Sequence, residues 1–420
     1  MRLHVKNFRS IREMDELEVA PLTLLYGPNG AGKSSLVYSL LTLRNFILNS
    51  NQLPNGLFNY TFANLGNYEA VVFDHNLANS IELGVTVEHN EFEVRYTLTF
   101  NETGGRLELS LNPAKGSPNP VKVLNPSYSL HLDFTFPYPL NQSTRVSGFS
   151  PGLPLHEVIW NGIIAQVKTG LPDSFGEATR LAESLNAPAE LLSKVQIVPL
   201  KRGFSKPLYS SVSLSPLLIT EDEVATYLSS NKYLESKLSR YLERIVERDF
   251  RVNRQPGTSL FSLDSNERKT GIASELVNEG FGVNQIVHFL AVCLHSGRNG
   301  YAADAPAQRE DVICVEEPEI HLHPSAVRRL AQALVEISRE ERKRFLISTH
   351  SEAFLSALLT IVAQGDLDPS DLACYYAVKE GKSTRFERQQ VNEKGQIEGG
   401  LVSFLEGEMA DIRTLLKVAE

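Results

Sequence analysis

The feature that most constrains this chain is a glycine-rich loop between an apolar run and a helical pattern. Residues 27–34 read Gly-Pro-Asn-Gly-Ala-Gly-Lys-Ser, which fits the P-loop pattern of a glycine, four arbitrary residues and Gly-Lys-Ser. The run 22–26 before the loop is apolar, and apolar residues at helical spacing follow it: Leu36, Val37, Leu40, Leu41 and Leu43. The order strand, loop, helix predicts an α/β fold with a phosphate site at this loop.

The residue types in the loop suit a nucleotide phosphate. Glycines let backbone N–H groups turn inward around an anion, and the N-terminus of the following helix adds a positive dipole. We expect Lys33 to reach the outer phosphates of ATP and Ser34 to bind Mg²⁺. The expected nucleotide contacts of this loop are Gly27, Pro28, Asn29, Gly30, Ala31, Gly32, Lys33, Ser34 and Ser35.

Composition narrows the class of protein. The chain has 420 residues, 42% of them hydrophobic and 22% charged, and it exceeds one typical domain. There is no leader-like segment, and no apolar run approaches the ~20 residues of a membrane span. The three cysteines are scattered, so we expect a cytoplasmic protein with reduced thiols and no membrane partner. The net charge of −9 argues against a dedicated nonspecific DNA binder.

A group of arginines permits two interpretations. Arginines at 240, 244, 248, 251 and 254 are interleaved with glutamates and an aspartate. A solvated helix face with paired charges is the favoured interpretation, and a contact with nucleic acid stays open.

Periodicity divides the chain into regions. Apolar and polar residues alternate over 81–87, 92–100 and 128–134, which predicts an antiparallel meander with one solvated face and breaks at Asn90 and Gly104-Gly105. Residues 112–156 are rich in Pro, Gly, Ser and Asn and are expected to form loops. The pattern over 175–250 is helical and includes one helix of about 25 residues, from Thr220 to Ile245, that begins with a capping box. After residue 270, helices alternate with apolar strands again.

We therefore expect one α/β nucleotide-binding domain that is split by an insertion. Residues 1–111 would form an N-terminal lobe with a β subdomain, residues 112–260 a loop-rich, mainly helical insertion, and residues 261–420 a C-terminal lobe. Because ATP hydrolysis does not require an insertion of this size, we expect residues 112–260 to dock either an effector protein or nucleic acid. The net charge of −9 favours the protein.

Two further motifs supply the groups that an ATPase needs. The apolar run 312–315 ends in Glu316 and Glu317. The first carboxylate would hold Mg²⁺, and the second would act as general base on the attacking water. Another apolar run, 345–347, ends in a polar cluster that contains His350, which we expect to donate to the γ-phosphate and to sense it.

A second glycine-rich loop precedes a helix. Residues 278–285 read Asn-Glu-Gly-Phe-Gly-Val-Asn-Gln, and the apolar segment 286–294 follows. The residues alone leave two alternatives open, a second anion site at a helix N-terminus and a simple helix cap by Asn284.

The whole set resembles the ABC class of ATPases, and within it the OLD-type and related AAA family ATPases of bacteria and archaea, many of them anti-phage defence components. Residues 3–11 are similar to the first strand of that group and of the RecF and chromosome-maintenance ATPases. Residues 27–34 match its Walker A motif, and Glu316 and Glu317 match its Walker B motif and catalytic glutamate. The resemblance covers roughly residues 1–100 and 270–360.

Three shorter matches extend the resemblance. Residues 318–324, Pro-Glu-Ile-His-Leu-His-Pro, are similar to a run that occupies the D-loop of this group, and His350 matches its switch histidine. Residues 280–285 look like a degenerate ABC signature loop. The resemblance implies a head-to-tail homodimer or a higher oligomer, in which Gly282 and Asn284 of one copy complete the ATP·Mg²⁺ site of the other.

The chain departs from the family pattern at two positions. Glu316 stands where ABC ATPases usually carry Asp, so the Mg²⁺ geometry must adjust to a longer side chain. Asn284 stands where Ser is usual, and its amide can still donate to a phosphate.

Two other groups of residues in the sequence have side chains of the types that bind metal ions. Glu319, His321 and His323 have ligand types that suit Zn²⁺, but the D-loop interpretation accounts for the same residues. Asp366 and Asp368 look like part of a Toprim nuclease site, which OLD proteins proper carry after the ATPase. We expect this pair in a turn ahead of Pro369 and no Toprim domain in this chain.

The resemblance implies the sensor or motor subunit of a defence system of the Septu or PARIS kind, with a nuclease or toxin effector encoded separately. The alternative is a RecF-like repair or recombination ATPase that acts directly on DNA. A transporter ATPase is a third interpretation, which residues 7–10 and 318–324 disfavour.

Overall fold

The chain folds into two compact units in a computed structural model that describes residues 1–114, 128–148, 156–169, 175–215, 217–218, 220–295 and 311–398. Each unit combines segments that are distant in sequence. The first unit contains Met1–Val19, Gly32–Val195 and Lys379–Arg385. The second contains Ala20–Ala31, Gln196–Val378 and the chain from Phe386 onward. The fold class is α/β with additional antiparallel sheets, as the sequence predicts.

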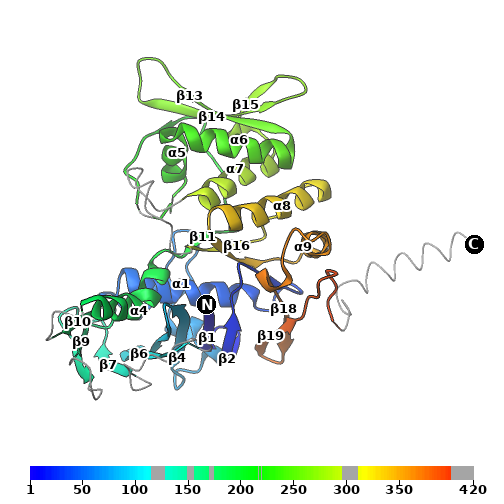
Figure 1. Cartoon of the computed structure of the whole chain (residues 1–420). Helices are drawn as coiled ribbons and strands as arrows, with labels where there is room; N and C mark the ends of the chain where they lie inside the picture. Colours follow the sequence, from blue (N-terminus) through cyan, green and yellow to red (C-terminus); the bar gives the residue numbers. More distant parts are fainter. Residues whose placement is uncertain are drawn as a thin grey trace, which may run out of the picture. The chain divides into compact units, whose positions relative to one another are not determined.

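The first unit is built on a six-stranded sheet in the order β2-β1-β4-β5-β6-β7 (Figure 1). All neighbouring strands in it are antiparallel. Alternate residues of β5 and β7 are buried, so the predicted meander is confirmed. Asn90, with φ 52°, makes the turn between β4 and β5. The strands are β1 (Arg2–Phe8), β2 (Ile11–Glu18), β4 (Ile81–His89), β5 (Phe92–Phe100), β6 (Gly104–Pro113) and β7 (Tyr128–Thr135).

Gly104 and Gly105 belong to β6 itself and not to the break before it. A Cβ on Gly105 would lie 2.1 Å from the carbonyl oxygen of Thr99 on β5. The strand therefore needs glycine because the two backbones approach closely, which strand periodicity alone does not reveal.

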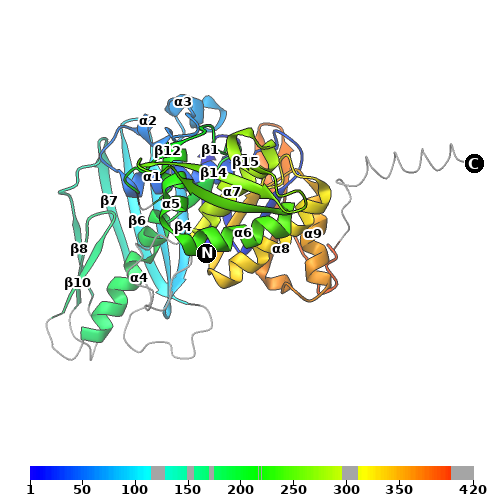
Figure 2. The same ribbon diagram turned by 90° about the horizontal axis from the view of Figure 1, so that it is seen from above.

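Helices and a small sheet complete the first unit. Helix α4 (Phe175–Ser193) packs against β4, β5 and α1 (Lys33–Leu48), as can be followed in Figure 2. The antiparallel strands β8 (Thr144–Gly148), β9 (His156–Trp160) and β10 (Ala165–Thr169) form a separate sheet. The short helices are α2 (Pro54–Leu57), α3 (Tyr68–Val71) and η1 (Phe73–His75).

The second unit is built on a sheet in the order β11-β16-β17-β3-β18-β19, whose first five strands are parallel. Every residue of β3 is buried, as expected for a parallel strand that is covered on both faces. The strands are β3 (Leu22–Tyr26), β11 (Gln196–Val198), β16 (Asp311–Glu316), β17 (Lys343–Ser348), β18 (Leu372–Glu380) and β19 (Ser383–Gln389).

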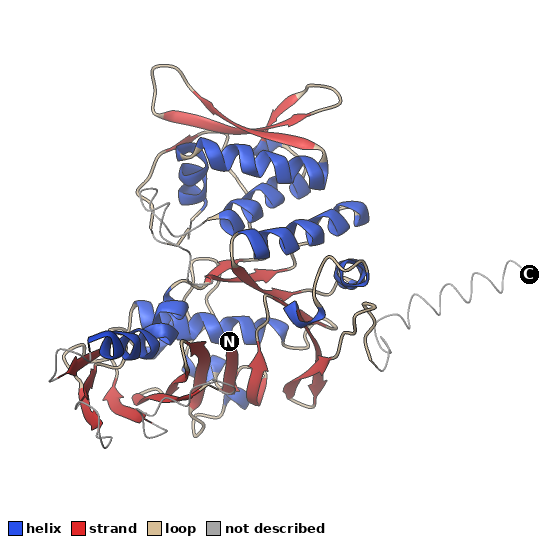
Figure 3. Ribbon diagram, in the orientation of Figure 1, coloured by secondary structure: helices blue, strands red, loops and turns tan. Residues whose placement is uncertain are grey.

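Helices cover this sheet, and a second antiparallel sheet lies beyond them. Helix α6 packs against α7, α8 and β13, an arrangement visible in Figures 1 and 3. The helices are α5 (Glu221–Ser230), α6 (Lys232–Val246), α7 (Phe281–Leu294), α8 (Pro324–Glu340), α9 (Glu352–Ala363), η3 (Leu276–Asn278) and η4 (Pro369–Asp371). The second sheet contains β12 (Tyr209–Ser210), β13 (Arg248–Arg254), β14 (Leu260–Glu267) and β15 (Ala273–Glu275).

The long helix predicted from Thr220 to Ile245 is two helices. Asn231 is extended (φ −131°, ψ 98°) and ends α5, and its side chain accepts a hydrogen bond from the N–H of Leu234 in the first turn of α6. An asparagine side chain that bonds to nearby backbone competes with the helix ladder in this way. The capping box of Thr220 and Glu223 is confirmed.

Beyond β7, the segment 112–260 also contains strands that the sequence patterns do not predict, from β8 to β13. Within the predicted loop region 112–156, residues 115–127 and 149–155 lie outside the described residues. Among the helices that the structure describes, none is long and apolar enough to cross a membrane.

Candidate functional site

The carboxyl ends of three adjacent parallel strands form one edge of the sheet in the second unit. Strand β3 leads into Gly27, β16 ends at Glu316, and β17 ends at Ser348 ahead of His350. The backbone ties these ends together, because Thr349 donates from its N–H to Leu25 O at 2.9 Å and Glu317 donates to Ser348 O at 2.8 Å. Crevices at this edge of a parallel sheet are where ligands bind in α/β folds.

The loop after β3 has the backbone of an anion cradle. Gly27, Gly30 and Gly32 have φ values of 133°, 75° and 96°, which side chains with a Cβ rarely adopt. A Cβ on Gly27 would lie 2.8 Å from Ala377 O, and one on Gly32 would lie 2.2 Å from the hydroxyl of Thr384. Helix α1 then begins at Lys33 without a side-chain cap, and the N-terminus of a helix suits an anion.

The boundary between the two compact units falls within this loop, between Ala31 and Gly32. Residues 27–31 belong to the second unit, and Gly32, Lys33, Ser34 and Ser35 belong to the first. Lys33 and Ser35 are buried, and Ser34 is half-buried. In the first unit the hydroxyl of Ser35 lies 3.0 Å from that of Ser10, in the turn after β1. The structure therefore describes the local conformation of each half of the loop.

The two carboxylates at the end of β16 differ in exposure and conformation. Glu316 is buried with 7% of its surface exposed. Glu317 has φ 44°, an uncommon left-handed conformation for a residue with a side chain. Its Oε1 lies 2.9 Å from Nδ1 of His350, so the structure brings the predicted base and the predicted sensor together. Because a carboxylate only accepts, Nδ1 carries the proton of this bond.

Arg202 also belongs to this edge, although no sequence motif contains it. Its Nη1 donates to the carbonyl oxygens of Glu316 at 2.8 Å and Pro199 at 3.0 Å, and its Nη2 donates to that of Glu317 at 2.8 Å. Burial lowers the pKa of its guanidinium to about 10, and the negative charges of nearby carboxylates oppose that shift. The only hint in the sequence is its place just after a short apolar strand that pairs with β16.

The residues considered for zinc turn to different partners. Glu319 is buried and accepts a hydrogen bond from the hydroxyl of Thr349, and burial raises the pKa of its carboxyl. Nδ1 of His323 accepts from the N–H of Ser325 at the start of α8. The ring of His321 lies against Phe281, with centroids 5.7 Å apart. In the part of the chain that the structure describes, no three His, Cys, Asp or Glu side chains gather as metal ligands.

The amide of Asn284, which we expect to donate to a phosphate, is engaged within the chain in this structure. Its Nδ2 donates to the carbonyl oxygens of Phe204 at 2.8 Å and Leu276 at 2.9 Å, and its Oδ1 accepts from the N–H of Phe204 at 2.6 Å. Both amide protons are used inside the chain, and the side chain is buried. Gly282 lies at the start of α7, where a Cβ would meet His321 O at 2.6 Å.

The aspartates near residue 367 form a turn, as predicted. Asp368 accepts from the N–H of Ser370 at 2.8 Å and caps the short helix η4, and this bonding lowers the pKa of Asp368. These groups are committed to local structure and do not join the carboxyl edge of the sheet.

The arginines of α6 and those at the two ends of β13 are held by acidic side chains or by a backbone carbonyl. Arg244 forms two hydrogen bonds of 2.6 Å with Glu336 on α8, and Arg240 lies 3.8 Å from Glu340. Arg248 lies 3.7 Å from Glu279, and Arg254 donates to Ser229 O at 2.7 Å. These pairs support the interpretation as a solvated, charge-paired face.

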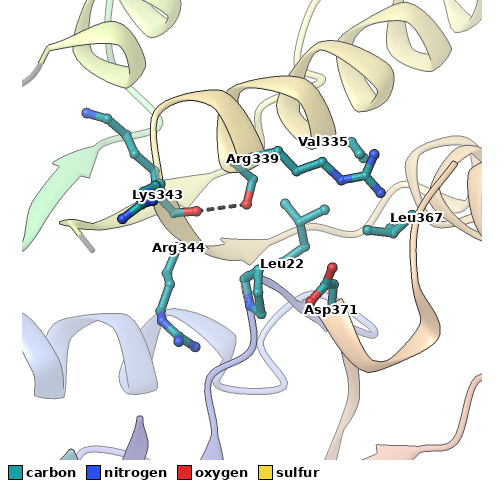
Figure 4. Close-up of a pocket in the computed structure, with 10 residues that line it drawn as sticks. Leu22, Val335, Arg339, Lys343, Arg344, Leu367 and Asp371 are labelled. Carbon is teal, nitrogen blue, oxygen red and sulfur yellow. Dashed lines mark hydrogen bonds between the residues drawn. The ribbon is translucent and has the colours of Figure 1, made fainter. Parts of the chain in front are cut away.

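A pocket of about 180 Å³ lies at the amino ends of β3 and β17, where β17 begins at Lys343 and β3 at Leu22 (Figure 4). Arg339 and Lys343 line it and are engaged within the chain: Arg339 donates to Asp366 O, and Lys343 to His295 O. None of the predicted site residues lines this pocket, because they follow the opposite ends of these strands.

Comparison with known proteins supports the ATPase class. A family model described as an AAA ATPase domain matches residues 159–355, and one described as an AAA domain matches residues 2–123. The chain is therefore an ATPase by its domains. It is also 23% identical over 368 residues to a curated protein named OLD nuclease from Thermus scotoductus. That match covers 84% of this chain and 59% of the relative, so the chain spans less than two thirds of that protein.

Solved structures with similarity to this chain include two SMC head domains. The SMC head domain from Thermotoga maritima is 10% identical with a TM-score of 0.41, over 93% of this chain and 98% of that one. An Smc head domain from Pyrococcus furiosus, bound to the C-terminal domain of ScpA, is 10% identical with a TM-score of 0.43, over 99% and 98%.

Proposed function

We propose that this chain binds ATP with Mg²⁺ and hydrolyses it with Glu317 as the general base. The observation that carries the proposal is the contact of Glu317 with His350, at the sheet edge where β3 enters the glycine loop. A water held by this carboxylate would attack the γ-phosphate. The loop backbone and Lys33 would bind the phosphates, which need cationic and N–H partners.

Oxygen ligands suit magnesium, and the chain offers them at the expected positions. The hydroxyl of Ser34 and the carboxylate of Glu316 are the ligands that we assign, and both are hard oxygen donors of the kind that Mg²⁺ prefers. Mg²⁺ neutralises charge on the phosphates when it is bound. Glu316 is buried, and Arg202 donates a hydrogen bond to its backbone carbonyl oxygen. The backbone that carries the Glu316 side chain is therefore held in place.

His350 would act as a sensor through its second nitrogen. Nδ1 faces Glu317, so Nε2 is the ring atom that we assign to the γ-phosphate. Nε2 would then contact the γ-phosphate while Nδ1 keeps its bond to Glu317.

We infer further that two copies bind ATP head to tail, with residues 280–285 of one copy facing the nucleotide of the other. The backbone at Gly282 is the contact that we assign, since Asn284 is used internally. From the resemblance of the motifs to those of anti-phage defence ATPases, we propose that the ATPase cycle controls an effector of a defence system. That this effector is encoded separately, and that it or nucleic acid docks at residues 112–260, stay predictions.

The proposal is tested by titration of a fluorescent ATP analogue against Lys33→Ala. We expect affinity to fall by about 10- to 100-fold, because hydrogen bonds to charged groups contribute ~1.5–3 kcal/mol. Lys201→Ala is the matched control, since Lys201 is an exposed cation, and it should bind ATP as the wild type does. Unchanged affinity of Lys33→Ala would refute the phosphate site. Turnover that rises sharply with duplex DNA would replace the effector role with the RecF-like one.

A further inference from the structure

A half-buried arginine holds the backbone of the two site glutamates. Arg202 lies in the connection that follows β11, the edge strand paired with β16. Its two terminal nitrogens reach the carbonyl oxygens of Glu316 and Glu317, which lie next to each other in the chain. The guanidinium also lies over the ring of Phe289 on α7, at 5.9 Å from the ring centroid. The contact therefore joins three segments of the second unit at one point.

The planar guanidinium suits this position and an ammonium does not. Two donors in a fixed fork can bond to two neighbouring carbonyls at the same time, and Nη1 also reaches the carbonyl of Pro199. A lysine at the same place has one nitrogen and cannot span these oxygens in one plane. Withdrawing a cation from water is costly, so an arginine whose terminal nitrogens donate to three backbone carbonyl oxygens calls for a reason beyond packing.

One of the two glutamates whose carbonyl oxygens Arg202 holds has an uncommon backbone conformation. Glu317 is the residue with φ 44°, and its carbonyl oxygen accepts from both Arg202 and the N–H of Ile320. A left-handed conformation of a residue with a side chain costs of order 1–3 kcal/mol and persists only where its surroundings fix it. The conformation of Glu317 also sets the direction of its carboxylate, which faces His350.

The loop that carries Arg202 is fixed from α7. Asn284 pairs with both the N–H and the carbonyl of Phe204, two residues after Arg202. Between them, Gly203 has φ 121°, and a Cβ there would lie 2.7 Å from Oδ1 of Asn284. Asn284 at the start of α7 is therefore hydrogen-bonded to Phe204, and Arg202, two residues earlier in the same loop, is hydrogen-bonded to Glu316 and Glu317.

We propose that Arg202 is a positioning residue for ATP hydrolysis, which sets the direction of the Glu317 carboxylate by holding the carbonyls of Glu316 and Glu317, and that Asn284 holds the Arg202 loop. This inference rests on the proposed role of Glu317 as the base. Arg202 acts on the backbone and does not itself touch the nucleotide. The arrangement also gives the glycine-rich loop at residues 280–285 a physical connection to the base of the same copy.

The test compares Arg202→Met and Arg202→Lys with the wild type in steady-state ATP hydrolysis and in ATP binding. We expect Arg202→Met to lower kcat by about 10- to 100-fold, because misplacement of a reacting group by ~1 Å can cost about 10²-fold. The Kd for ATP should change less than about threefold. Arg202→Lys should recover only part of kcat, since it restores charge without the fork.

A double-mutant cycle separates positioning from general damage. In a Glu317→Gln background the added Arg202→Met change should cost little more hydrolysis, because the group that it positions is already gone. Additive losses, or a kcat for Arg202→Met equal to that of the wild type, would overturn the inference. Lys201→Met is the matched control, because Lys201 is the adjacent, exposed cation, and its kcat should be unchanged.

A second variant covers the case that Arg202→Met fails to fold. Asn284→Asp keeps the acceptor for the N–H of Phe204 and removes the two donated bonds. It should lower kcat by about 3- to 10-fold at unchanged ATP Kd, as a smaller displacement of the same carboxylate would. A rise in ATP Kd with unchanged kcat would instead assign Asn284 to nucleotide contact and overturn its role here. If wild-type enzyme hydrolyses no ATP, the proposed function fails and not the positioning role alone.

Discussion

Two charged regions of the second unit use the same residue types in opposite ways. At the carboxyl edge of the sheet, Glu316 and Glu319 are buried and Arg202 is half-buried. On the face shared by α6 and α8, Arg244 and Glu336 keep 43% and 37% of their side-chain surface exposed. Burial makes each partner at the edge expensive to remove, since a buried charge left without partners costs several kcal/mol. Exposed pairs are screened by water and contribute little.

The two regions also differ in what the charges contact. The edge joins a cation to backbone carbonyls and leaves the carboxylate of Glu317 facing His350. On the α6–α8 face, cations pair with carboxylates, and the charges of each pair neutralise each other. Charge that is not neutralised locally is available to a ligand, so function is expected at the edge and solvation at the face.

The largest effect in this comparison is expected from Glu317→Gln at the edge. Loss of the base should lower kcat by about 10²- to 10⁴-fold, while ATP binding is kept because the phosphate contacts remain. Phosphate release at saturating ATP measures kcat, and light scattering should find a dimer that persists with ATP. Wild-type turnover in this variant would move the role of base elsewhere, with Glu319 the next candidate. Glu336→Gln on the α6–α8 face is the control and should hydrolyse normally.

His350→Ala should have the next largest effect. We expect kcat to fall by about 10- to 100-fold with ATP affinity nearly unchanged, because the histidine contacts Glu317 and, as we propose, would contact only the last phosphate. Paired titrations with ATP and ADP measure this split. A parallel loss of both affinities, together with early thermal unfolding, would show that His350 is a structural residue. His323→Ala serves as the control, since that side chain only caps α8.

Acid should destabilise the fold through histidines that are buried in the second unit. Burial lowers the pKa of His288 to about 3, with a further contribution from the positive charge of Arg202. Burial likewise lowers the pKa of His295 to about 4, with the charge of Lys343 adding to it. Unfolded histidines bind protons below about pH 6.5, so the unfolded state holds more protons and stability is lost as pH falls from 6.5 towards 4.

Each of these histidines contributes at most ~1.4 kcal/mol of lost stability per pH unit in that window. Chemical unfolding at pH 7.5 and 5.5 measures the stability lost between these pH values. The loss caused by His288 and His295 together should be about half as large in His288→Leu. His131→Leu, at an exposed position on β7, should leave it unchanged. Equal pH dependence of the wild type and His288→Leu would mean that His288 is not buried as a neutral ring.

The edge was largely predictable because each of its motifs follows an apolar strand. Parallel strands bring their carboxyl ends together, so the glycine loop, Glu317 and His350 could be assigned to one fold edge from spacing alone. The antiparallel meander was predictable for the same kind of reason, since period-two alternation marks a sheet with one solvated face.

The missed features depend on contacts between distant segments. Arg202 is 115 residues from Glu317, and a single arginine in a loop has no periodicity to detect. The internal use of Asn284 depends on the same loop, 80 residues away. Asparagine is a residue type that can end one helix and cap the next, as Asn231 does. Hydrophobic periodicity nevertheless continues across Asn231, and it favoured a single helix.

The smallest effect is expected from Arg244→Ala on the α6–α8 face. The exposed pair with Glu336 should contribute no more than about 1 kcal/mol to the free energy of unfolding. The urea midpoint of Arg244→Ala against the wild type, at low salt and at 0.5 M salt (about five times a typical buffer), measures that contribution, which should shrink as salt screens the pair. ATP turnover should be unchanged with and without duplex DNA, because the charges of this face neutralise each other. A loss of DNA-stimulated turnover in Arg244→Ala would make the face a nucleic-acid contact, and the contrast between a functional edge and a solvated face would then fail.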